Sequence, residues 1–295
     1  MSDLAPAPPL VTVALPVYNA GDHFRLAVLS IVRQTFTDWE VLVLDDGSSD
    51  SALDFLDELH DPRIKVWRDG RNMGIAVRLN QAIDLAQGRY FARMDADDVS
   101  FPERFSKQVA ALQADHKLDL VATRAITINE FNDVSGSFPY ALAHAEICAR
   151  PWLGFRFPHP TWMGKTEWFR SHRYRAPAPY LCEDQELLLR SYRTSRFATI
   201  DEVLFAYRVR DATDWTKFPA MRRATAVFQL RHFLRAGQWH FAAMALLMLQ
   251  VKAGRDQWRK LSRSSHLLQT AGASPEMKDH WRDVLQRVAG NRGFP

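Results

Sequence analysis

The stretch Val41-Leu42-Val43-Leu44-Asp45-Asp46-Gly47-Ser48-Ser49-Asp50 decides the fold class of this 295-residue chain. Four consecutive apolar residues are typical of a strand that is buried on both faces, as in a parallel sheet. The acidic and small residues that follow are a dense turn signal. The arrangement recurs downstream, where the segment 90–94 runs into Asp95-Ala96-Asp97-Asp98. Two buried strands that each end in carboxylates predict an open α/β sheet with a polar crevice at its edge.

Strand and helix patterns alternate on both sides of these two segments. Further strands are predicted over 10–15, 63–67, 118–128 and 200–209, and helices over 26–32, 74–86 and 183–192. This order predicts a mostly parallel central sheet with helices on both faces. Ser100-Phe101-Pro102-Glu103 has the form of a capping box, which predicts that a helix begins after Ser100. After residue 211 no strand pattern remains, and two or three helices are expected.

Composition restricts the class of protein. Apolar residues make up 47% of the chain and charged residues 24%, which excludes a disordered chain, a collagen-like repeat and a coiled coil. Cys148 and Cys182 form no C-x-x-C pair, so a disulfide framework and a thiolate zinc site are disfavoured and an intracellular protein is expected. The first ten residues lack the apolar segment of a secretory signal, and the longest apolar run, 241–249, is too short to cross a bilayer.

Charge is distributed unevenly along the chain. Residues 1–210 contain 24 Lys and Arg against 28 Asp and Glu, whereas residues 211–295 contain 14 against 6. A basic tail on an acidic body indicates an anionic partner, although a solvated helical surface is the alternative. Basic residues, Trp239 and Trp258 surround the apolar segment 239–251, which favours contact with an anionic membrane surface. A helical cap packed on the rest of the protein, or a dimer contact, would explain the same pattern.

The acidic clusters suggest a specific kind of site. Carboxylates crowded into one crevice repel each other unless a cation or hydrogen-bond donors are present. Mg²⁺ is typically held by one or two carboxylates together with substrate phosphates, so Asp95 and Asp97 predict a metal–diphosphate site. A capped acidic turn is the alternative. Neither an EF-hand nor a glycine-rich phosphate loop fits the residue spacing.

Together these motifs resemble glycosyltransferase family 2, whose members are inverting enzymes with the GT-A fold. The resemblance covers about residues 10–210 and rests on Pro16-Val17-Tyr18-Asn19, Gln34-Thr35-Phe36, Trp39 to Asp50, Asn72-Met73-Gly74, Asn80, Ala86-Gln87-Gly88-Arg89-Tyr90, Met94 to Asp98, Glu183-Asp184 and Tyr207-Arg208. It implies an α/β GT-A nucleotide-diphospho-sugar transferase domain over residues 10–212. Residues 10–128 would form its nucleotide-sugar-binding half and residues 129–212 its acceptor half. We expect residues 1–9 to be disordered and residues 213–295 to form a basic helical extension.

The resemblance also implies a role for each matching residue. A nucleotide sugar, in the first place a UDP-sugar, would be bound by Pro16, Val17, Tyr18, Asn19, Asp46 and Asp95. Asp97 and Asp95 would bind Mn²⁺ or Mg²⁺, and Asp184 would be the general base. Glu183, Trp162 and His159 are candidates for acceptor contacts.

Three of these assignments have a competing interpretation or a departure from the family pattern. The aromatic residues between 152 and 168 could be core, and Glu183 and Asp184 could be first-turn acids favoured by the helix dipole. Many relatives carry a histidine where this chain has Arg210. Arginine cannot ligate a metal but suits a phosphate, so Arg210 is expected to contact the diphosphate.

The expected function is therefore an inverting, metal-dependent glycosyltransferase that acts on a saccharide or lipid-linked acceptor in cell-surface polysaccharide biosynthesis. We expect it in the cytoplasm, peripheral on the cytoplasmic face of the inner membrane. A nucleotidyltransferase acting on sugar phosphates is an alternative, but such enzymes usually carry a glycine-rich loop where this chain has Pro16 to Asn19. Non-enzymatic binding of an anionic polymer is a further alternative. The acidic body and the lack of a recognisable binding motif disfavour nucleic acid as a partner.

Overall fold

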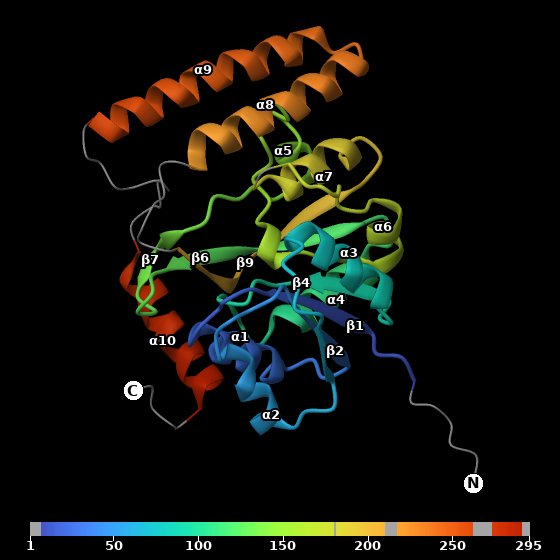
Figure 1. The fold of residues 1–295 in the computed structure, drawn as a ribbon, viewed down its shortest axis with the longest axis vertical. Helices are drawn as coiled ribbons and strands as arrows, with labels where there is room; N and C mark the ends of the chain where they lie inside the picture. Colours follow the sequence, from blue (N-terminus) through green and yellow to red (C-terminus); the bar gives the residue numbers. More distant parts are fainter. Residues whose placement is uncertain (1–6, 180, 210–216, 262–272, 291–295) are drawn as a thin grey trace.

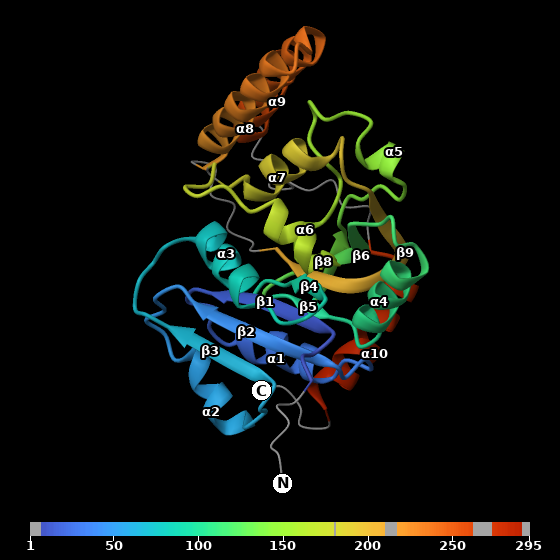
Figure 2. The same ribbon diagram turned by 90° about the vertical axis from the view of Figure 1, so that its right-hand side faces the viewer.

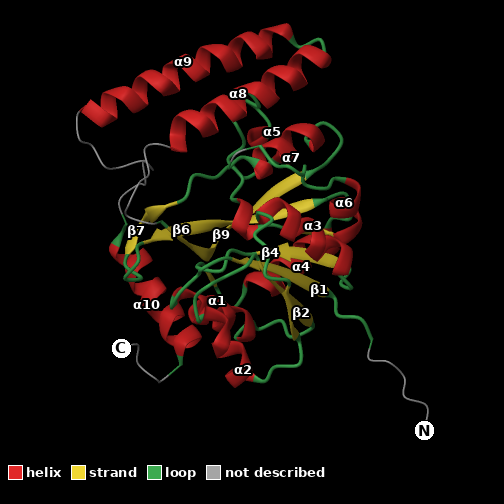
Figure 3. Cartoon of the chain, viewed as in Figure 1, coloured by secondary structure: helices red, strands yellow, loops and turns green. Residues whose placement is uncertain are grey.

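The computed structural model describes residues 7–179, 181–209, 217–261 and 273–290 (Figure 1). One mixed sheet crosses the middle of the molecule and contains nine strands of these residues (Figure 3). Its order is β3-β2-β1-β4-β8-β6-β9-β5, with β7 paired to β6. The strands are β1 (Val11–Val17), β2 (Trp39–Asp45), β3 (Ile64–Arg68), β4 (Tyr90–Arg93), β5 (Val99–Ser100), β6 (Leu120–Ile128), β7 (Val134–Ser137), β8 (Met163–Lys165) and β9 (Phe197–Arg208).

The first half of the sheet is parallel, as the alternating pattern predicts. β3, β2, β1 and β4 are hydrogen-bonded in parallel, and all seven residues of β2 are buried. In this register Val17 lies beside Asp45, and Ala14 lies beside Arg93. The segments that follow β1, β2 and β4 therefore meet at one edge of the sheet, where ligands bind in open α/β folds.

The second half of the sheet is mixed, and here the structure corrects one expectation. β8 lies antiparallel between β4 and β6, while β6 and β9 run parallel with two register shifts. Ser100 does not cap a helix but pairs with Phe205 in the antiparallel β5–β9 contact. Its backbone N–H donates to Ser30 Oγ, and the helix begins at Arg104 instead. In a capping box the Glu103 side chain would accept from the Ser100 backbone N–H. In the structure the Ser30 hydroxyl, which is distant in sequence, accepts from this N–H instead.

Helices cover both faces of the sheet (Figure 2). α3 (Ile75–Leu85), α6 (Thr166–Ser171) and α7 (Glu183–Ser191) share one apolar core with the sheet. α1 (His23–Val32), α2 (Phe55–Leu59) and α4 (Arg104–Ala114) pack on the other face, and the short helices are η1 (Ala52–Asp54), α5 (His144–Ile147) and η2 (His159–Thr161). Between α3 and β4 the chain passes so close to β1 that a Cβ on Gly88 would lie 2.5 Å from the Thr12 amide nitrogen. Only glycine allows this approach.

The described helices of the C-terminal extension lie in two places (Figure 1). α8 (Lys217–Arg235) and α9 (Trp239–Leu261) form an antiparallel hairpin beyond α7 at one end of the molecule. α10 (Pro275–Ala289) packs against α1 at the opposite end, where Trp281 is buried and donates its indole N–H to the Asn132 carbonyl over 2.7 Å. No described helix is both long enough and apolar enough to cross a membrane. The expectation of disorder over residues 1–9 falls mainly outside the described residues.

Candidate active site

A pocket of about 430 Å³ lies at the sheet edge where β1, β2 and β4 end. Six of the residues proposed from the sequence to bind nucleotide sugar or metal line it, namely Pro16, Val17, Tyr18, Asp46, Asp95 and Asp97. The other lining residues are Ala20, Asn72, Ile75, Arg78 and Ala96. Tyr18 is 54% exposed although it follows a buried strand. This pocket combines an available aromatic ring with several carboxylates.

Asn19 lies next to this pocket and joins two of its loops. Its backbone N–H donates to Ser48 Oγ over 3.1 Å, and its Oδ1 accepts from the Ser49 amide over 2.8 Å. A second contact joins the same loops, because the Gly21 amide donates to Asp50 Oδ2 over 2.8 Å. Asn19 adopts a left-handed backbone conformation with φ of 49°, which asparagine tolerates better than most residues. Asn19 thus holds the loop after β1 against the loop after β2.

Asp46 is fixed by donors from the start of α3. Its Oδ1 accepts from the Met73 amide over 2.7 Å and from Arg78 Nε over 2.9 Å, and its Oδ2 accepts from the Gly74 amide over 3.0 Å. Gly74 has φ of +86°, a conformation that favours glycine. Arg78 is only 1% exposed and also forms an ion pair with Asp69. Asp46 is therefore a rigid carboxylate, and its Oδ2 retains lone-pair capacity for a donor on a ligand.

The loop after β4 is held by two buried arginines. Both terminal nitrogens of Arg93 contact the Asp95 carboxylate, at 2.7 and 2.5 Å. Arg208 anchors the same loop from β9, because its backbone amide donates to Asp98 Oδ1 and its Nε to the Asp97 carbonyl, both over 2.7 Å. Burial raises the pKa of Asp95 despite Arg93, and the nearby Asp97 and Asp184 raise it further. The loop thus concentrates negative charge where it faces the pocket.

Glu183 and Asp184 begin α7, and the charge of Arg93 acts on both carboxyl groups. Burial and the neighbouring Asp184 raise the pKa of Glu183 to about 7, and burial raises the pKa of Asp184. His159 Nδ1 lies 3.8 Å from Glu183 Oε1, and His159 Nε2 is 2.7 Å from the Tyr174 hydroxyl. Burial and then Arg93 lower the pKa of His159 well below its ordinary value, so this imidazole is neutral. The charge of Asp184 also raises the pKa of Asp95, so the two carboxylate groups of the sequence prediction influence each other electrostatically.

The structure does not place two of the candidate residues from the sequence, Trp162 and Arg210, at the site. Trp162 has no exposed surface, donates its indole N–H to the Phe157 carbonyl and packs edge-on against His159. It therefore cannot present a face to a sugar ring, and the alternative of core packing describes it. Arg210 lies outside the described residues.

Sequence reasoning did not identify Arg78, Arg93 or Tyr174, although each touches a candidate residue. Arg78 gives the clearest signal that was available. It occupies a position on the buried stripe of α3, between Ile75 and Leu79, where arginine is rare unless it is paired. An arginine within an apolar stripe therefore points to a buried carboxylate partner.

The residues at the pocket can accommodate a divalent cation. Among the described residues no cluster of three or more His, Cys, Asp or Glu side chains is placed to hold a metal by protein ligands alone. Asp95 and Asp97 nevertheless line one pocket, and two carboxylates completed by diphosphate oxygens form a donor set that suits Mg²⁺ or Mn²⁺. The site fits a cation that binds together with its phosphate ligand.

Comparison with known proteins identifies the family. The model of "Glycosyl transferase family 2" matches residues 12–174. The chain belongs to glycosyltransferase family 2. This family 2 glycosyltransferase is 31% identical over 212 residues to EpsE of Bacillus subtilis, which is named as a glycosyltransferase, with 70% of this chain and 74% of EpsE covered. It is 30% identical over 213 residues to a protein of Haemophilus influenzae named an uncharacterized glycosyltransferase, covering 68% of this chain and 66% of that protein's length. With WfgD of Escherichia coli, a UDP-Glc:alpha-D-GlcNAc-diphosphoundecaprenol beta-1,3-glucosyltransferase, it shares 34% identity over 103 residues, which is 35% of this chain and 41% of WfgD.

Solved structures confirm that the fold is of the GT-A type. The family 2 chain superposes on S. aureus TarS 1–349 in complex with UDP-GlcNAc with a TM-score of 0.62 and 20% identity, covering 94% of this chain and 81% of the TarS fragment. Mannosyltransferase PcManGT from Pyrobaculum calidifontis, in complex with GDP-Man and Mn²⁺, gives a TM-score of 0.57 and 19% identity over 97% of this chain and 88% of that one. The fold and family expected from the sequence are thereby confirmed.

Proposed function

We propose that this protein transfers a sugar, with inversion, from a nucleotide-diphosphate sugar to a saccharide or lipid-linked acceptor. The observation that carries the proposal is the convergence of Tyr18, Asp46, Asp95 and Asp97 on one pocket, with the charges of Glu183 and Asp184 coupled to that of Asp95. Three named relatives or neighbours support a nucleotide-sugar donor, because WfgD uses UDP-Glc and the solved complexes contain UDP-GlcNAc and GDP-Man. A UDP-sugar is the first donor to test.

Each residue of the pocket has a chemical task in this reaction. The exposed Tyr18 ring can stack on the base, and Asp46 Oδ2 can accept a hydrogen bond from a base N–H. Asp95 and Asp97 would hold Mn²⁺ or Mg²⁺, which would supply positive charge to the diphosphate leaving group. Arg93 fixes the orientation of Asp95 through two contacts. Arg210 is proposed as a further phosphate contact from the sequence alone.

Asp184 is proposed as the general base. A carboxylate on the acceptor side must take the hydroxyl proton while the acceptor oxygen attacks the anomeric carbon. Burial raises the pKa of Asp184, which makes the carboxylate a stronger base. Glu183 and His159 would support the acceptor side, because neutral His159 lies against Glu183 and is itself fixed by Tyr174.

The acceptor and the location follow the same proposal. EpsE and WfgD are named as glycosyltransferases, and other relatives are named for teichuronic acid and colanic acid biosynthesis, which supports a role in cell-surface polysaccharide synthesis. α9 exposes Leu246, Leu247, Val251 and Trp258, and basic residues flank the hairpin. An exposed apolar helix face next to basic residues suits a peripheral position on an anionic membrane.

Binding and transfer assays test the proposal. Purified protein is titrated calorimetrically with a panel of nucleotide sugars in the presence of Mn²⁺, Mg²⁺ or EDTA, and nucleoside diphosphate release is then measured with saccharide acceptors. Asp97→Ala should abolish the metal-dependent part of donor binding, whereas the exposed Asp57→Ala on α2 should bind as wild type. Equal donor affinity and equal EDTA sensitivity in both variants would contradict the metal assignment. Release of inorganic diphosphate from a nucleoside triphosphate and a sugar phosphate would indicate the nucleotidyltransferase alternative.

A further inference from the structure

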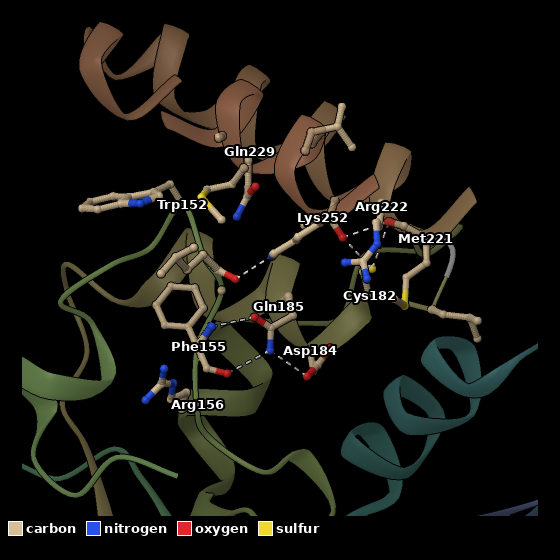
Figure 4. Close-up of a pocket in the computed structure, with 18 of the residues that line it drawn as sticks. Trp152, Phe155, Arg156, Cys182, Asp184, Gln185, Met221, Arg222, Gln229 and Lys252 are labelled. Carbon is tan, nitrogen blue, oxygen red and sulfur yellow. Dashed lines mark hydrogen bonds between the residues drawn. The ribbon is translucent and has the colours of Figure 1, made fainter. Parts of the chain in front are cut away.

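A second pocket, of about 640 Å³, lies between the α8–α9 hairpin and the catalytic body (Figure 4). Its floor is formed by the segment 152–156 and by the start of α7, and its roof by the inner faces of α8 and α9. Figure 4 shows Asp184 and Gln185 on the floor, with Arg222 and Lys252 reaching down from the hairpin. The pocket therefore extends to the proposed base but is separate in its lining from the nucleotide pocket.

The hairpin is seated on this floor by specific contacts. Gln229 Nε2 donates to the Pro151 carbonyl over 3.0 Å, and Trp152 packs against Phe241 with ring centroids 4.8 Å apart. Cys182 Sγ lies 3.0 Å from Thr225 Oγ1. These contacts hold the hairpin in place over the pocket.

The lining of this pocket combines apolar surface with positive charge. Trp152, Leu249 and Met221 contribute apolar side chains, whereas Arg156, Arg222, Lys252 and Arg255 contribute cations. Asp184 is the one acidic residue among those that line it. A ligand that complements these walls has an anionic group and an apolar part.

Three of these four cations, Arg156, Lys252 and Arg255, form no ion pair within the described part of the chain. Arg222 is paired through two nitrogens with Asp256. Lys252 donates one of its three N–H groups to the Leu153 carbonyl over 3.0 Å and forms no ion pair there, and Arg255 forms none either. Burial lowers the pKa of Lys252, and Arg222 and Arg255 lower it further. A bound anion would offset the repulsion among these groups.

We propose that this pocket is the acceptor site and takes the phosphate or diphosphate ester of an apolar alcohol. Its phosphate oxygens would lie at Lys252 and Arg255, with the attached sugar directed to Asp184. The inference rests on the proposed function, because it assigns Asp184 to the acceptor hydroxyl. The outward face of α9, which carries the exposed Leu247 and Val251, would rest on the bilayer from which the apolar chain enters.

Binding of a short soluble probe tests this inference without turnover. Farnesyl diphosphate, inorganic diphosphate and farnesol are titrated separately into the full chain by calorimetry. Farnesyl diphosphate should bind more tightly than either fragment, because it engages both the cations and the apolar wall. Lys252→Met keeps the length of the side chain and should weaken binding about ten-fold or more, since a hydrogen bond to a charged group is lost. Arg255→Gln, at an exposed position, should act in the same direction.

Arg235→Met, at the far end of α8, is the matched control and should bind farnesyl diphosphate as wild type. Binding of UDP is measured in the same variants and should not change. Absence of saturable farnesyl diphosphate binding, or wild-type affinity in both pocket variants, would overturn the inference. Inorganic diphosphate binding as tightly as the farnesyl ester would show an anion site without a lipid part and would also overturn it. If the inference fails in this way but UDP-sugar transfer to a saccharide is observed, the proposed function still holds. If farnesyl diphosphate binds but no nucleotide sugar does, the proposed function is refuted and the lipid-phosphate site is not.

Discussion

Replacing Arg78 by methionine should destabilise the protein and weaken donor binding together. Arg78 is 1% exposed and donates to Asp46, Asp69, the Arg71 carbonyl and Gln81. Removing one partner of a buried ion pair typically costs about 3–5 kcal/mol. The lower end applies here, because the Asp69 side chain is 43% exposed and Asp46 keeps the amide of Met73 as a donor. We therefore expect a loss of about 3 kcal/mol in the free energy of unfolding.

This loss can be followed by three measurements. The unfolding midpoint should fall by about 6–12 °C, at roughly 2–4 °C per kcal/mol for a chain of this size class. The affinity for the nucleotide donor should fall about ten-fold, because Asp46 loses the side chain that orients it. The pKa of Asp69, which hydrogen bonding to Arg78 holds at about 2, should return toward its ordinary value in an NMR titration.

Lys107→Met is the matched control for Arg78→Met. Lys107 pairs with Glu202, and the two side chains are 39% and 51% exposed, so this pair is worth at most about 1 kcal/mol. If Arg78→Met melts within about 2 °C of Lys107→Met on the scale above and binds the donor as wild type, the structural role assigned to Arg78 is wrong.

Three further predictions concern the acceptor side and the hairpin. Asp184→Asn should lower kcat by about 10²–10⁴-fold with little change in donor affinity, and a larger kcat loss in Glu183→Gln would reverse the two roles. The pKa of Glu183 is raised to about 7, so its contribution to stability is fully present below its unfolded pKa near 4.5 and is lost as pH rises through 7. Thermal unfolding should accordingly show Glu183→Gln gaining stability relative to wild type from pH 5 to pH 8, by up to about 3 kcal/mol, and a constant difference would contradict the raised pKa. Finally, the double variant Leu247→Glu and Val251→Glu should float with anionic vesicles less than wild type does. Phe131→Glu, at a residue 78% exposed on the body, should float as wild type does. Equal flotation of wild type, the double variant and Phe131→Glu would refute the membrane face on α9.

The sequence determined the parallel half of the sheet and the ends of its strands. Strands β1 to β4 are short apolar runs that are buried almost throughout, except β3 at the sheet edge, and such runs are specified by local composition. The carboxyl ends of neighbouring parallel strands lie at the same edge of a sheet. Tyr18, Asp46 and Asp97 follow such strands, so their place in one pocket follows from the strand order alone. The family motifs lie at these strand ends, which is why six of the residues that line the pocket could be predicted from the sequence.

Only the tertiary structure decided which partners the buried polar groups find. Arg78 meets Asp46 across 32 positions of the chain, and Arg208 meets Asp98 across 110, and no local pattern specifies such pairs. The local sequence predicts Ser100 to be a helix cap, but Ser100 belongs to a strand because it pairs with β9. The pocket beneath the α8–α9 hairpin likewise depends on where two helices dock on residues 151–155, which lie far away in sequence. Local sequence fixes the elements through short-range sterics and hydrophobic periodicity, whereas the pairing of charges and the enclosure of cavities depend on long-range packing.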